Sequence, residues 1–106
     1  PLSERQLKRI CRRAGVGLAR TGSFYGNGSG DIAIAFTTAN RVPHFGKGAF
    51  VSMQMMDDDK IDPVLEMSAE AVEEAIISSL WHAETLTGRA GRVQHGLQEC
   101  LAALQK

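Results

Sequence analysis

The first twenty residues place their apolar side chains three or four positions apart, which is the spacing of one face of an α-helix. These positions are Leu7, Ile10, Cys11, Ala14 and Leu18. Ser3 and Gln6 match the capping-box pattern, so the helix should begin just after Ser3. Gly15 and Gly17 either weaken its second half or mark close packing against a sheet.

A glycine-rich loop, residues 21–30, leads into the most strand-like run of the chain, residues 31–38. That run is apolar without a helical period, which predicts a strand buried on both faces. Residues 49–55 alternate loosely and predict a second strand, which could form a hairpin with the first across a long loop. Because two strands do not form a stable sheet in isolation, further strands should come from elsewhere.

The second half of the chain predicts two more helices. The longer one has Asp62 as N-cap and Pro63 at its first position, and it should run to about Leu86, with Gly88 as its stop. A Gly/Arg turn separates it from a short last helix, residues 96–106. The side chains expected to point inward from that helix are Leu97, Cys100, Leu101 and Leu104. The order helix, strand, strand, long helix, short helix indicates the α/β (α+β) class.

The length and the charge of the chain limit the classes of function that are possible. With 106 residues the chain is one domain or part of one. Its formal net charge of zero gives no general attraction to nucleic acid or to an acidic membrane. The charge is unevenly placed, because residues 1–20 hold six Lys or Arg and one Glu, whereas residues 57–74 hold eight Asp or Glu and one Lys. These two segments should attract each other, within one subunit or between subunits.

Cysteine usage and hydropathy bear on the compartment. Cys11 and Cys100 fall at apolar positions of predicted helices, which favours reduced core thiols over a disulfide. No run approaches the ~20 apolar residues of a membrane span. We therefore expect a cytoplasmic protein with neither membrane nor nucleic acid as partner. The abrupt start at Pro1, without an initiator Met, suggests a chain that was processed or cut from a longer one.

Candidate chemistry gathers at Ser29, Gly30 and Asp31, where the loop meets the first predicted strand. In an extended chain, residues i and i+2 point to the same face, roughly 6.5–7 Å apart. Ser29 and Asp31 would then present a hydroxyl and a carboxylate to one side, and Gly30 lets a backbone or a ligand approach closely. The alternative is a turn followed by the start of a strand.

Two other patterns fail on spacing. A phosphate-binding loop needs a Lys-Ser/Thr pair and a following helix, whereas a strand follows here. The acidic run 57–59 does not fit a calcium loop, because Ile61 falls where a ligand is needed. We interpret that run as a solvated acidic turn and expect no metal and no cofactor.

The stretch RRAGVGLARTGSFYGNGSGDIAIAFTTAN, residues 12–40, resembles the DmpA-type aminopeptidases, which include L-aminopeptidase/D-esterases and β-peptidyl aminopeptidases. The long helix ending in AETLTG is also similar to that family. The resemblance implies an αββα sandwich related to the ornithine acetyltransferase type. It also implies a precursor that cleaves itself before a serine, which becomes the N-terminal nucleophile of the smaller chain. This sequence resembles that smaller chain without its first strand, so the nucleophile would precede Pro1.

The resemblance also assigns site residues. Ser29 and Asp31 match the family's second serine and the acidic residue two positions on, although some members have Glu in place of Asp. Gly28 and Gly30 belong to the substrate or oxyanion loop that carries them. A hydroxyl nucleophile needs a nearby base and hydrogen-bond donors for the developing oxyanion. The remaining donors would lie on the larger chain of the same precursor.

The function implied is hydrolysis of N-terminal residues from small peptides, amides or esters, without a cofactor. On this interpretation the 106-residue chain alone is inactive, and its unpaired strand edges favour a homo-oligomer. Two alternatives are a non-catalytic interaction module of the same fold and an acyltransferase of the ornithine acetyltransferase type.

Overall fold

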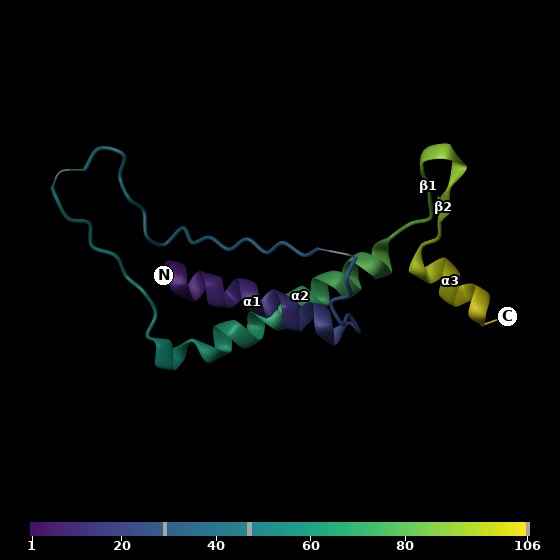
Figure 1. The fold of residues 1–106 in the computed structure, drawn as a ribbon, viewed down its shortest axis with the longest axis horizontal. Helices are drawn as coiled ribbons and strands as arrows, with labels where there is room; N and C mark the ends of the chain where they lie inside the picture. The colour runs from purple at the N-terminus through teal and green to yellow at the C-terminus, as the bar shows by residue number, and fades with distance from the viewer. Residues whose placement is uncertain (29, 47, 106) are drawn as a thin grey trace.

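The computed structural model describes residues 1–28, 30–46 and 48–105, and its centre is a pair of helices that run side by side in the same direction (Figure 1). The elements in chain order are α1 (Glu4–Arg20), η1 (Asp58–Lys60), α2 (Asp62–His82), β1 (Leu86–Thr87), η2 (Arg89–Gly91), β2 (Val93–Gln94) and α3 (Leu97–Leu104). Helices and strands occur together, as expected for the α/β class.

Helix α1 begins where the sequence predicts. The Ser3 hydroxyl accepts a hydrogen bond from the Gln6 backbone N–H at 3.3 Å, and the Gln6 side-chain oxygen accepts one from the Ser3 N–H at 3.0 Å. Both halves of the capping box are therefore formed. Two backbone donors that a helix start would otherwise leave unpaired are satisfied.

The core lies between α1 and α2 and depends on one glycine. Ile61, Leu65 and Ala69 are buried, and Gly17 of α1 is buried beside Ala69. A Cβ at position 17 would overlap the Ala69 carbonyl oxygen and lie 2.8 Å from the Val72 Cβ. Gly17 thus marks close packing, as one interpretation of the sequence held, but against a helix and not against a sheet.

The two predicted strands are not formed by this chain. Residues 31–38 and 49–55 are extended but lack ladder hydrogen bonds among the described residues, and the hairpin between them is absent there. Figure 1 shows the first segment running back along the helix pair. The prediction of burial on both faces is also wrong for this chain, since the large side chains on one face are mostly exposed: Ile32 92%, Ile34 85% and Phe36 81%. A strand needs a neighbour for its N–H and C=O groups, and within this chain neither segment supplies one to the other.

Both ends of α2 differ from the prediction. The N-cap is Ile61 rather than Asp62, because η1 delivers the chain to Ile61 in an already helical conformation. The helix ends at His82 and not near Leu86, since Ala83 turns extended. Tertiary contacts fix this end: the backbone at Gly96 lies so close to Ala83 that a Cβ there would overlap the Ala83 carbonyl oxygen.

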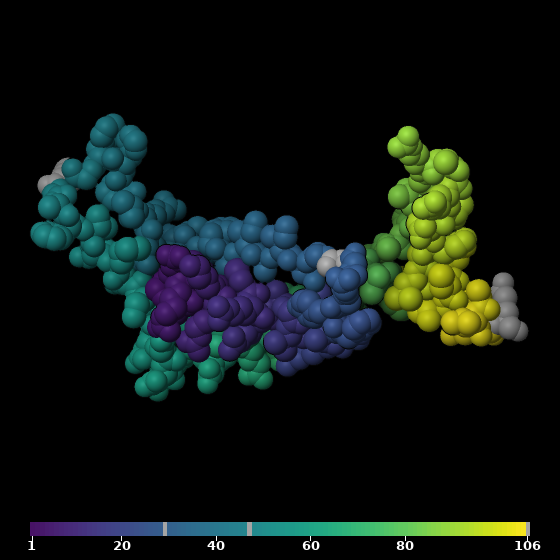
Figure 2. Space-filling model, viewed as in Figure 1, coloured from purple at the N-terminus to yellow at the C-terminus, as the bar shows by residue number. Residues whose placement is uncertain are grey.

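The C-terminal part was predicted as a turn and a helix, but it also contains a small hairpin. β1 and β2 pair antiparallel with Leu86 opposite Gln94 and Thr87 opposite Val93. The hairpin and α3 project away from the helix pair at the right of Figure 2. The side chains expected to point inward from α3 are not buried: Leu104 is 83% exposed and Cys100 is also exposed. The main partner of α3 among the described elements is α2.

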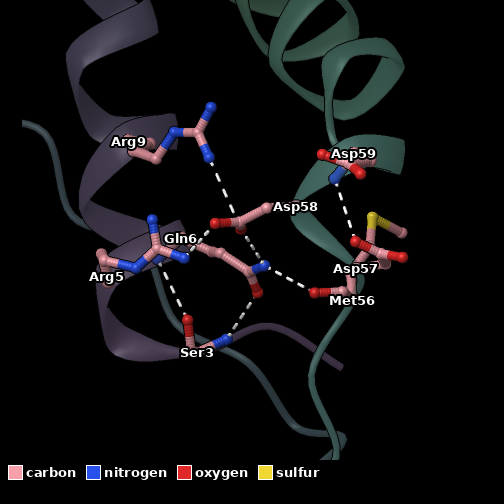
Figure 3. Close-up of polar contacts among 8 residues, drawn as sticks. All are labelled: Ser3, Arg5, Gln6, Arg9, Met56, Asp57, Asp58 and Asp59. Atoms are coloured by element: carbon pink, nitrogen blue, oxygen red, sulfur yellow. Dashed lines mark hydrogen bonds and ion pairs between the residues drawn. The ribbon is translucent and has the colours of Figure 1, made fainter.

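The oppositely charged segments meet within the chain, as the sequence predicts. Asp58 forms ion pairs with Arg5 and, at 3.5 Å, with Arg9. At the other end of the helix pair, Arg20 Nη1 lies 3.3 Å from a Glu73 carboxylate oxygen. Figure 3 shows Arg5 and Arg9 reaching from α1 toward Asp58. The prediction of a solvated acidic turn is therefore wrong for Asp58, which joins α1 to the η1 turn that precedes α2.

The buried Gln6 completes this cluster. Its side-chain N–H groups donate to the Met56 carbonyl and to the Asp58 carboxylate, each at 2.7 Å (Figure 3). The Arg5 and Gln6 hydrogen bonds hold the pKa of Asp58 below its usual 3.8, because both favour the charged form. One glutamine thus ties the start of α1 to the segment that leads into α2.

The chain is elongated, measuring 68 × 33 × 26 Å, and its radius of gyration is 20.0 Å. A compact domain of this length would have about 13 Å. None of the helices in the described ranges combines the length and apolar character that a membrane crossing requires.

Candidate functional site

The site begins where α1 gives way to the glycine-rich loop. The Thr21 hydroxyl donates to the Leu18 carbonyl at 2.7 Å, and the Gly22 N–H donates to the Ala19 carbonyl at 3.0 Å. Gly22 has φ +97°, a conformation that glycine adopts without the cost that a Cβ would impose. This turn reverses the chain, so the loop runs back toward the helix it has just left.

Asp31 follows the loop and lines a pocket of about 500 Å³. Three parts of the chain form the wall of the pocket. The loop and the extended segment contribute Tyr25, Gly30, Asp31, Ile32 and Ala33; α1 contributes Cys11, Arg12, Ala14, Gly15 and Leu18; α2 contributes Val72 and Ile76. The pocket therefore combines an apolar floor, a carboxylate and a guanidinium in one recess, which is the usual make-up of a small-molecule site.

Ser29 lies outside the described residues, so its predicted position on the same face as Asp31 stays a prediction. Gly28 and Gly30, on either side of it, have open surroundings: apart from their chain neighbours, no described atom lies within 4 Å of where a Cβ would be. The packing of the described chain therefore does not require glycine at these positions. Space for a ligand or another chain segment remains beside both.

Two other serines near the start of the chain, Ser3 and Ser23, have contacts that give them local roles. Ser3 caps α1 through its hydroxyl. The Ser23 hydroxyl accepts from the Tyr25 N–H at 3.4 Å, inside the loop. Within the described ranges no three His, Cys, Asp or Glu side chains come together as metal ligands would.

Sequence reasoning missed most of the pocket wall. Cys11 was interpreted as a core thiol, and the structure places it half-buried at the pocket. Tyr25 was not singled out at all, although an aromatic residue inside a glycine-rich loop is a usable signal. Val72 and Ile76 belong to α2, and nothing in their spacing along the sequence relates them to Asp31. Only the fold brings these residues together.

Known proteins are similar to this chain over most of its length. The sequence model of peptidase family S58 matches residues 1–94. The chain is 43% identical over 91 residues to the beta-peptidyl aminopeptidase BapA of Sphingosinicella microcystinivorans, which covers 86% of this chain and 23% of that protein. It is 33% identical to the BapA of Sphingosinicella xenopeptidilytica, over all of this chain and 27% of that protein.

Two solved structures contain the same fold. The PH0078 protein of Pyrococcus horikoshii OT3 is 48% identical, with a TM-score of 0.86. The L-aminopeptidase D-Ala-esterase/amidase of Ochrobactrum anthropi is 35% identical, with a TM-score of 0.84, and is described as a serine aminopeptidase with a variant of the Ntn hydrolase fold. Each comparison covers 99% of this chain and 30% of the other.

The helix pair, the extended segment and the pocket thus form part of a peptidase fold. The chain belongs to peptidase family S58, the family of the DmpA-type aminopeptidases. It spans about a quarter of the length of the curated relatives that it matches.

Proposed function

We propose that this chain supplies one wall of the active site of an aminopeptidase that releases N-terminal residues from small peptides, amides or esters. The observation that carries the proposal is the position of Asp31. It follows the glycine-rich loop directly and lines a pocket whose floor comes from both long helices. The match to a peptidase family covers Asp31 and supports a role for it in peptide hydrolysis.

In this proposal the nucleophile is the N-terminal serine of a smaller chain, produced when the precursor cleaves itself. Ser29 donates a hydrogen bond to the oxyanion or relays a proton. Asp31 orients a hydroxyl or holds the ammonium group of the substrate. Gly28 and Gly30 leave room for substrate to approach, which agrees with the open space at both positions. The chemistry needs neither a metal nor an organic cofactor.

The rest of the protein completes the fold in this proposal. Residues 31–38 and 49–55 pair with strands of the larger chain and become part of an αββα sandwich. Two observations support this: their backbone groups have no ladder partner among the described residues, and the large side chains of 31–38 are mostly exposed. Strand edges of this kind also favour a homo-oligomer. This chain alone is then inactive.

Kinetics of the full-length protein with amino-acid p-nitroanilides test the proposal. Ser29→Ala should lower kcat by about 10²–10³, because the loss of one oxyanion donor costs about 2.7–4 kcal/mol. Asp31→Asn keeps the shape of the side chain but removes its charge, and it should also lower activity. Both variants should melt within a few degrees of wild type, so that a loss of turnover reports on the site and not on folding.

Ser52→Ala is the matched control, because Ser52 does not line the pocket. It should leave kcat and KM unchanged. If Ser29→Ala and Asp31→Asn both retain wild-type turnover while melting normally, the catalytic assignment is wrong and the turn interpretation holds.

A further inference from the structure

The backbone of Tyr25 adopts an unusual conformation for an aromatic residue. Its φ is +58°, in the left-handed region that bulky L residues rarely occupy. The residue sits inside a loop in which glycine would fit this conformation at lower cost, and Gly26 follows immediately. Such an outlier persists when the surroundings hold it in place. For Tyr25, the holding contact is with α1.

The ring of Tyr25 lies over Gly15. A Cβ at position 15 would overlap the Tyr25 hydroxyl oxygen and lie 3.1 Å from the ring carbon Cζ. Any residue other than glycine would therefore push the ring away from the helix. The missing side chain of Gly15 leaves a gap on the surface of α1, and the Tyr25 ring fills that gap.

This pair borders the same pocket as Asp31. Tyr25 is the largest side chain among the lining residues, and several of the others are small: Ala14, Gly15, Gly30 and Ala33. The ring is half-exposed, so one part contacts α1 and the rest remains accessible. The placement of this one ring therefore controls how much of the recess beside Asp31 is free.

We infer that the ring of Tyr25, seated on Gly15, sets the size of the substrate's N-terminal side chain that fits beside Asp31. This inference rests on the proposed aminopeptidase function and deepens it, because it names a specificity-determining residue of that site. The ring acts by its bulk and not by its hydroxyl. The ring contacts the side chain of the bound substrate and takes no part in the bond-breaking step.

The test compares substrates that differ in side-chain size. Full-length protein is assayed with L-, D- and β-amino acid p-nitroanilides that carry either a methyl or an isobutyl side chain. Tyr25→Ala should raise the ratio of kcat/KM for isobutyl over methyl by about tenfold, the scale on which apolar pockets discriminate size. The change should come through KM, with kcat altered by no more than about threefold, because the interaction removed is uniform binding. Tyr25→Phe should behave as wild type.

Gly15→Ala provides a second test that leaves Tyr25 unchanged. By displacing the ring it should alter the isobutyl/methyl ratio by about threefold or more, while in the Tyr25→Ala background it should have no further effect, as for two residues acting through one contact. Phe24→Ala and Gly48→Ala are the matched controls. Phe24 is exposed and does not line the pocket, and a Cβ at position 48 would have no neighbour. Both should leave the ratio unchanged.

The outcomes separate the inference from the function beneath it. If the wild type is active and neither Tyr25→Ala nor Gly15→Ala changes the isobutyl/methyl ratio, the inference is wrong but the proposed function stands. A Tyr25→Phe variant that behaves like Tyr25→Ala also overturns it, because the hydroxyl would then matter and not the ring. A wild type without activity on any of these substrates overturns the proposed function, and the inference with it. If Tyr25→Ala does not fold, the ratio in Gly15→Ala decides.

Discussion

The helix pair and the extended segments are both rich in apolar residues, yet only the helix pair is a finished structure in this chain. α1 and α2 bury Ile61, Leu65 and Ala69 between them. The segments 31–38 and 49–55 leave most of their large side chains exposed. The difference is one of hydrogen bonding: a helix satisfies its backbone within itself, whereas a strand requires a neighbour.

A polar link between Asn40, just after the first extended segment, and Gln54 of the second illustrates this need. The Asn40 side chain donates to the Gln54 carbonyl at 2.6 Å and accepts from the Gln54 N–H at 2.9 Å. A carboxamide offers the same donor and acceptor as a peptide group. Asn40 therefore pairs with Gln54 much as a neighbouring strand would, but for one residue only.

Ile34→Asp, in the first extended segment, should have the largest effect on stability, but only in the full-length protein. In this chain Ile34 is 85% exposed, so the thermal melt of the helices, followed by circular dichroism, should not change. In the full-length protein, where we propose that this face is covered, a buried unpaired charge should cost about 3–5 kcal/mol in urea unfolding. Ile34→Val is the control and should cost about 0.5–1.5 kcal/mol there. An equal response in both proteins would show that residues 31–38 stay uncovered.

Gly17→Leu should disrupt the helix pair itself. The side chain would meet the Ala69 carbonyl and the Val72 Cβ, so the helices must move apart. Overpacking of this kind costs about 1–3 kcal/mol, partly offset by the better helix propensity of leucine. The helical melt of this chain should shift to lower temperature. Ala19→Leu on the exposed side of α1 is the control and should not lower it.

The helices could be predicted from the sequence because their signals are local. Ser3 and Gln6 lie three residues apart, and the capping box formed as the pattern predicts. Both predicted boundaries of the long helix were wrong, one because of the adjoining turn and one because of a residue distant in sequence. Asp62 was expected as an N-cap, but η1 places Ile61 there, and α2 ends where Gly96 crosses Ala83.

The pocket was only partly predictable for the same reason. Asp31 could be singled out because it adjoins a glycine-rich loop in sequence. Gly15 and Tyr25 are ten residues apart, and no spacing rule relates a helical glycine to a loop tyrosine. Val72 lies further still and reaches the pocket only because α2 packs on α1. Residues that meet through packing between elements are not encoded in a local pattern.

Gln6→Leu should weaken the junction between the two regions. Gln6 is fully buried and binds the Met56 carbonyl and the Asp58 carboxylate. Its replacement removes the donor to the Met56 carbonyl and one hydrogen bond of Asp58, whose two arginine ion pairs remain. This should cost about 1–3 kcal/mol in the urea unfolding of this chain. Gln98→Leu is the matched control, because Gln98 also donates to a carbonyl, that of Trp81, but on the exposed surface. It should change stability by no more than about 0.5 kcal/mol.

The smallest expected effect is a loss of helix-pair stability in acid. Hydrogen bonds from Arg5 and Gln6 lower the pKa of Asp58 from its usual 3.8. The folded state therefore holds the charged form more strongly than the unfolded chain does. The stability that this provides is fully present above pH about 4 and is lost as pH falls through the lowered pKa. Asp58→Asn should flatten the pH dependence of the urea midpoint below pH 4, whereas Asp59→Asn should not, since the contact described for Asp59 is made by its backbone N–H to Asp57. An acid-induced loss that persists unchanged in Asp58→Asn would place its origin in another carboxylate, such as Glu4 or Glu99, whose pKa values are also lowered.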